Sequence, residues 1–102
     1  MTDLMDRLEA RLGEVGTKLT AAAGGQALCR LDGQATSAKE LEGRMALLLE
    51  VRRAVRADPQ VDLSAIADKW RVDLAVRQER GASPAWISYL TGGLAETGLL
   101  AG

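Results

Sequence analysis

The side chains that most often carry enzyme chemistry are scarce in this sequence. Its 102 residues include no histidine and a single cysteine, Cys29. Histidine is the most common general base and metal ligand, so its absence argues against serine triads, cysteine–histidine pairs and most zinc sites. The neighbouring Arg30 could lower the pKa of the Cys29 thiol, but a lone cysteine beside Leu28 is more typical of a small buried apolar group.

Carboxylates are the remaining catalytic candidates, and Asp68 with Asp73 is one such pair. Fourteen acidic residues on helices produce pairs of this kind on solvated faces without any catalytic role. The glycine pairs Gly24-Gly25 and Gly92-Gly93 lack the spacing and the following Lys and Ser or Thr of a phosphate-binding loop. The sequence therefore predicts a protein that is not an enzyme and that uses no cofactor, metal or small-molecule substrate.

Positive charge is concentrated in residues 43–56, which hold four arginines and one acidic residue in a chain of net charge −1. Basic residues near the end of a helix stabilise its dipole, which is the simplest interpretation. The alternative is a DNA-binding regulator, because Ala67 and Val72 resemble the first helix and turn of a helix-turn-helix, with Arg71 in place of the usual glycine. Its contacts to nucleic acid would be Arg44, Arg52, Arg53, Arg56, Arg71, Arg77 and Arg80.

Helical spacing of apolar residues runs through most of the chain, and length and composition fit one mainly α domain over residues 1–102. The predicted helices span about 3–22, 37–57, 62–80 and 84–92. Their boundaries rest on a capping box at Ser37–Glu40, the stop at Asp58-Pro59, the cap Asp62, closure at Gly81, the start at Ser83-Pro84 and the weakening pair Gly92-Gly93.

An Asp-Gly turn signal lies between the first two predicted helices. Asp32-Gly33 sits between short runs and predicts a small β-hairpin within residues 27–36. A plain loop is the alternative, because alanine and glutamine stand where strands favour β-branched residues.

Aromatic residues and an apolar tail mark the predicted contact surface. Trp70 lies on the apolar stripe of the third helix and is predicted to be core, whereas Trp86 and Tyr89 lie on a short helix before the apolar tail 94–102. The first helix carries a narrow apolar seam at spacings of three and four. The predicted protein interface comprises Met5, Leu8, Leu12, Val15, Leu19, Trp86, Tyr89, Leu94, Leu99 and Leu100.

The first 57 residues resemble the phage head-tail joining proteins of the lambda type. In that family a helix ends near glycine, an Asp-Gly hairpin follows, and a second helix opens with Ser or Thr and runs through leucines. The matching features here are Gly25, Asp32-Gly33, Thr36-Ser37 and Leu41 to Leu49. The resemblance implies a virion structural protein that assembles as a ring between portal and tail, without catalysis.

The sequence as a whole favours a non-enzymatic assembly or adaptor protein that binds a protein partner or forms a homo-oligomer. We also consider the DNA-binding regulator, and an antitoxin or inhibitor that wraps a protein partner. A single cysteine and no secretion leader predict a cytoplasmic location, or the virion if the phage resemblance holds. The low-charge stretch Pro84–Leu100 falls short of the about 20 apolar residues of a membrane span.

Overall fold

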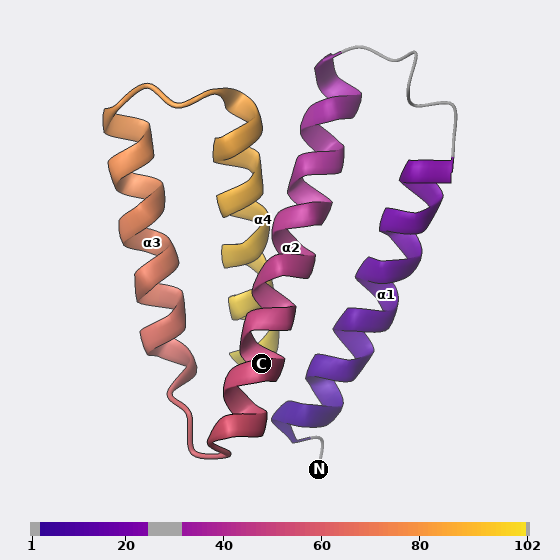
Figure 1. Ribbon diagram of the computed structural model, residues 1–102, viewed down its shortest axis with the longest axis vertical. Coiled ribbons are helices and arrows are strands. Elements are labelled where there is room, and N and C mark those ends of the chain that lie inside the picture. The colour runs from indigo at the N-terminus through magenta and orange to yellow at the C-terminus, as the bar shows by residue number, and fades with distance from the viewer. Residues whose placement is uncertain (1–2, 25–31, 102) are drawn as a thin grey trace.

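The computed structural model describes residues 3–24 and 32–101, and within these ranges the chain forms four α-helices and no strand (Figure 1). The mainly α fold class predicted from the sequence is confirmed. The helices are α1 (Leu4–Gly24), α2 (Asp32–Ala57), α3 (Leu63–Glu79) and α4 (Pro84–Ala101).

The ends around α3 follow the local signals in the sequence. The Asp62 carboxylate accepts a 3.0 Å hydrogen bond from the Ser64 amide and so caps the first turn of α3. Gly81, just past the end of α3, has a φ of 72°, a conformation that favours glycine. These two predicted boundaries are confirmed, and the short connection that Gly81 closes brings the start of α4 beside the end of α3.

The predicted hairpin and the predicted start of the second helix are both wrong over the described residues. Helix α2 begins at Asp32, so residues 32–36 are helical and the capping box at Ser37 lies inside the helix. Only Gln34 and Ala35 of these five residues are strong helix formers, so cooperative extension of the helix from the residues that follow prevails over the turn signal of Asp32-Gly33. The rest of the predicted hairpin, residues 27–31, lies outside the described residues.

The predicted end of the fourth helix is also wrong, because α4 continues through Gly92 and Gly93 to Ala101. Both glycines are buried, and a β-carbon on either would overlap a neighbour: the Glu40 carbonyl at Gly92 and the Trp70 ring at Gly93. A glycine inside a helix costs about 1 kcal/mol relative to alanine, and this close packing compensates for that cost. The predicted apolar tail 94–102 is therefore helical through residue 101.

Helices α2 and α4 form the central contact of the fold. Helix α1 packs on α2, and α3 packs on α4, so that α1 and α3 lie on opposite sides of the pair (Figure 1). The α2–α4 crossing is close, because Gly43 lies directly against the backbone of Tyr89 and leaves no room for a β-carbon. The molecule measures 43 × 33 × 21 Å, and its thinnest dimension is about two helix diameters.

The apolar stripes predicted for the helices form the core. The stripe of α3 contributes Ala67 and Trp70, which are buried, as predicted for Trp70. The seam of α1 contributes Leu8 and Val15. The buried apolar residues are Leu8, Val15, Leu47, Leu48, Val51, Ala67, Trp70, Leu90 and Leu100.

Candidate functional site

Trp86 is a large apolar side chain held at the surface, with 47% of it exposed. It lies in the first turn of α4, which begins at Pro84 as the sequence predicts, and its amide is 3.5 Å from the Ser83 hydroxyl. Tryptophan and tyrosine dominate the energetics of protein interfaces because they offer a large apolar body with a polar edge. An exposed tryptophan on a defined helical turn is therefore the leading candidate for a contact with another protein.

The Trp86 ring is held in place from the α3 side. The Arg77 guanidinium lies 4.4 Å from the ring centroid, in a cation–π contact. Arg77 is itself positioned by a 3.0 Å hydrogen bond from its Nε to the Asp73 carboxylate. The Gly81 turn allows this contact between Arg77 and Trp86, because it brings the start of α4 back beside the last turns of α3.

A row of aromatic rings connects Trp86 to the core. Trp86 meets Tyr89 edge to face at 5.5 Å, and Tyr89 stacks on Trp70 at 5.9 Å with an interplanar angle of 9°. The Trp70 indole N–H donates a 3.0 Å hydrogen bond to Glu50 of α2, which also pairs with Lys69. The buried ring is thus fixed at both its face and its edge, and through Tyr89 it supports the exposed ring of Trp86.

Two hollows flank Trp86 and Tyr89. The first, of about 290 Å³, lies toward α3 and α2 and is lined by Glu50, Lys69, Trp70, Asp73, Trp86, Tyr89 and Leu90. The second, of about 210 Å³, is lined by Lys39, Ser83, Ala85, Trp86 and Tyr89. An exposed aromatic ring between two shallow hollows with charged walls can anchor a partner side chain on either side.

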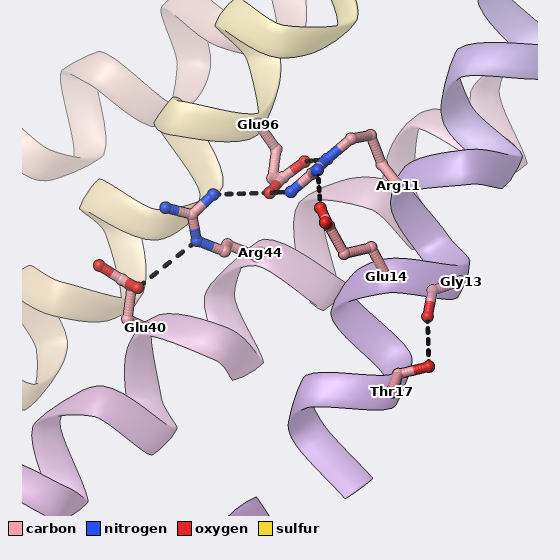
Figure 2. A network of polar contacts seen from close by, with 7 residues as sticks. All are labelled: Arg11, Gly13, Glu14, Thr17, Glu40, Arg44 and Glu96. Carbon is pink, nitrogen blue, oxygen red and sulfur yellow. Dashed lines mark hydrogen bonds and ion pairs between the residues drawn. The ribbon is translucent and has the colours of Figure 1, made fainter. Parts of the chain in front are cut away.

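A second polar arrangement lies inside the fold, around Glu96 of α4 (Figure 2). The Glu96 side chain has no exposed surface, yet its carboxylate is held by arginines from two other helices. Arg11 of α1 donates twice, through Nε at 2.7 Å and Nη2 at 2.8 Å, and Arg44 of α2 donates through Nη1 at 2.6 Å. Arg11 also pairs with Glu14, and Arg44 Nε lies 3.5 Å from Glu40.

The two arginines fix the ionisation state of Glu96. Burial by itself raises the pKa of this carboxyl, but the hydrogen bonds and charges of Arg11 and Arg44 outweigh that effect, so its pKa is lowered. Hydrogen bonding to Glu96 in turn raises the pKa of Arg11, and burial of Arg11 opposes that shift only partly. Glu96 is therefore an ionised group that joins α1, α2 and α4, and no side of its carboxylate faces solvent.

The structure separates the predicted interface residues into two groups. Leu8, Val15 and Leu100 are buried within the chain, whereas Trp86 and Leu99 are about half exposed. Leu100 also receives a 2.8 Å hydrogen bond at its carbonyl from Arg7 Nε, which ties the end of α4 to α1. The remaining predicted residues, Met5, Leu12, Leu19, Tyr89 and Leu94, are partly buried.

The arginines predicted for the DNA-binding alternative are dispersed. Arg44 holds Glu96, Arg71 pairs with Asp68, and Arg77 lies between Asp73 and Trp86. Asp68 and Asp73, the carboxylate pair considered from the sequence, each pair with one of these arginines. Helix α3 runs unbroken across the proposed turn. Three other arginines stay together: Arg52, Arg53 and Arg56 line a hollow of about 260 Å³ with Leu49.

Sequence reasoning did not identify Glu96, Glu50 or Gly43 as structural residues. A signal for Glu96 was present, because it is the only charged residue of Pro84–Leu100, and a single charge in an apolar helix must find partners if it is buried. Nothing local marks Gly43 or Glu50, since their roles depend on Tyr89 and Trp70, which are distant in the sequence.

No helix among residues 3–24 and 32–101 is long and apolar enough to cross a membrane. The same described residues hold no group of three histidine, cysteine, aspartate or glutamate side chains placed to bind a metal ion, and Cys29 lies outside them. No protein-family model, no curated protein and no solved structure matches the chain.

Proposed function

We propose that this protein is a non-enzymatic assembly or adaptor protein that acts through protein–protein contacts, with Trp86 as the anchor of one contact surface. The observation that carries the proposal is the half-exposed Trp86 ring, fixed by Tyr89 and Arg77 between two hollows. A ring that is already ordered loses little conformational freedom on binding, which favours affinity.

A position-specific crosslink tests this proposal. A photo-reactive phenylalanine analogue replaces Trp86 in one variant and Val72, which is 63% exposed on α3, in the matched control. After irradiation in the native cell, we expect a discrete covalent adduct with a protein from position 86 and none from position 72. Equal adducts from both positions, or none from position 86, would contradict the proposal.

The phage head-tail form of this proposal rests on the resemblance of residues 1–57. The order of the first two helices agrees with it, but the described part of the predicted hairpin, residues 32–36, is helical. If the form is correct, the adduct from position 86 contains a portal or tail protein. An adduct with a cellular toxin would instead favour the antitoxin alternative.

A further inference from the structure

The side of the α1–α2 pair that faces away from α4 has the composition of an interface. Helical geometry identifies this side, since Arg11 and Arg44 both point to Glu96 of α4. Met5 and Leu12 of α1 lie about 100–120° around the helix from Arg11, and Met45 and Leu49 of α2 lie about 100–140° from Arg44. All four are partly buried, and Met5, Leu12 and Met45 also pack against the core, so their outer parts form a narrow apolar strip between the two helices.

Exposed charges of opposite sign accompany this apolar strip, acidic on α1 and basic on α2. On α1, Asp6 and Glu9 are exposed and lie about 160–220° around the helix from Arg11, in the same sense as Met5 and Leu12. On α2, Arg53 lies about 180° and Arg56 about 120° from Arg44, and both are exposed. Among the described residues, none of these four side chains takes part in an ion pair.

The acidic and the basic residues lie at the same end of the molecule. Figure 1 shows α1 and α2 side by side and antiparallel, with the start of α1 next to the end of α2. Asp6 and Glu9 are in the first turns of α1, and Arg53 and Arg56 are in the last turns of α2. This face is therefore acidic on its α1 side and basic on its α2 side, at one level along the helices.

We propose that this face binds a second copy of the chain, in a two-fold dimer whose axis runs parallel to α1 and α2. A rotation about such an axis lays α2 of each copy over α1 of the other without reversing the helix direction. Arg53 and Arg56 of one copy then meet Asp6 and Glu9 of its partner, and the two apolar strips cover each other. The proposal rests on the proposed role in assembly and names the first partner.

The size of the face fits a reversible dimer. Two adjacent helices of which the shorter spans about 30 Å present on the order of 600 Å². Stable dimers bury about 800 Å² per partner, so association should depend on concentration. It should also weaken with salt, because the ion pairs at its edges are exposed.

A charge-swap experiment on the full chain tests the dimer. Sedimentation equilibrium at low salt measures the dissociation constant of the wild type, of R53E/R56E and of D6R/E9R. We expect each double variant to weaken dimerisation by at least about tenfold, because like charges then face each other. An equimolar mixture of the two should recover dimers, since the swapped charges are complementary. R71E/R80E, on α3 and at its C-cap, is the matched control, and it should dimerise like the wild type.

Several outcomes would overturn the dimer. These are a wild type that is monomeric at millimolar concentration, charge variants that dimerise unchanged, and a mixture that recovers nothing. Loss of dimer in W86A but not in the charge variants would place the second copy at Trp86. Binding of duplex DNA that is lost in R53E/R56E, with no recovery in the mixture, would make nucleic acid the occupant. A normal crosslink from position 86 in R53E/R56E separates failure here from failure of the proposed function.

Circular dichroism at matched concentration checks that each variant is folded. If R53E/R56E loses helicity, R53Q/R56Q replaces it, and we still expect weaker dimerisation. If the neutral variant is folded and dimerises like the wild type, the proposal fails.

Discussion

The two halves of α4 differ in what their side chains contact. In the first half, Trp86 lies at the surface, where its ring meets Tyr89 edge to face and the Arg77 guanidinium lies over the ring. In the second half, Gly92, Gly93, Glu96 and Leu100 are buried against the other three helices. An apolar segment without bulky aromatic residues can therefore lie at the centre of a fold. The aromatic segment beside it keeps the Trp86 ring about half exposed.

The largest expected effect distinguishes glycines that are packed from glycines that are free. Gly92→Ala places a β-carbon into the Glu40 carbonyl, and we expect the free energy of unfolding to fall by at least about 3 kcal/mol. The matched control is Gly98→Ala on the same helix, where nothing lies within 4 Å of the added carbon, and we expect a gain of up to about 1 kcal/mol. Urea unfolding measures both, and a change of the same sign in both variants would contradict the packing described here.

The next effect concerns the buried carboxylate. Glu96→Gln removes the charge that pairs with Arg11 and Arg44, and we expect a loss of about 3 kcal/mol in unfolding free energy. Glu79→Gln on the exposed end of α3 is the control, with an expected change within about 0.5 kcal/mol. A loss of the same small size in both variants would show that the network contributes little.

The pH dependence of stability gives a third test of the same carboxylate. Because the pKa of folded Glu96 is below its unfolded value of 4.5, its contribution is fully present above that value and is lost as the pH falls through the folded pKa. The difference in unfolding free energy between wild type and Glu96→Gln should therefore be constant at neutral pH and shrink in acid. A difference that grows in acid would mean that the folded pKa is raised instead.

The smallest expected effect on stability is at Trp86, in the first turn of α4. Trp86→Ala loses the edge contact with Tyr89 and the cation–π contact with Arg77, and we expect the free energy of unfolding to fall by about 1 kcal/mol. Thermal and urea unfolding measure this value. A loss as large as that of Gly92→Ala would show that the Trp86 ring is also part of the core.

Local sequence signals predicted the helices well, but they predicted poorly which residues of other helices each one contacts. The periodic stripe of the third helix predicted the core residue Trp70, and the cap at Asp62 predicted the start of α3, because each depends on residues close in the sequence. The length of α4 was missed because Gly92 and Gly93 break helices on intrinsic propensity, and only contacts with Glu40 and Trp70 reverse that preference.

The candidate site was predicted in part for the same reason. Trp86 and Tyr89 stood out as the aromatic residues outside the predicted core stripes. Arg77 could not be linked to Trp86 from the sequence, because the two side chains meet only after the Gly81 turn folds α4 back beside α3. Leu100 was also predicted to lie in the protein interface, yet it is fully buried against the other helices.

The most direct test of the central claim is the affinity of the protein crosslinked from position 86 for three variants of the purified chain. We predict that Trp86→Ala weakens binding by at least about tenfold, as expected for an interface anchor. Leu99→Ala, at the exposed but non-aromatic end of α4, and Val72→Ala should bind like the wild type. Wild-type affinity of Trp86→Ala, or an equal loss in Leu99→Ala, would contradict the assignment of the contact to the first half of α4.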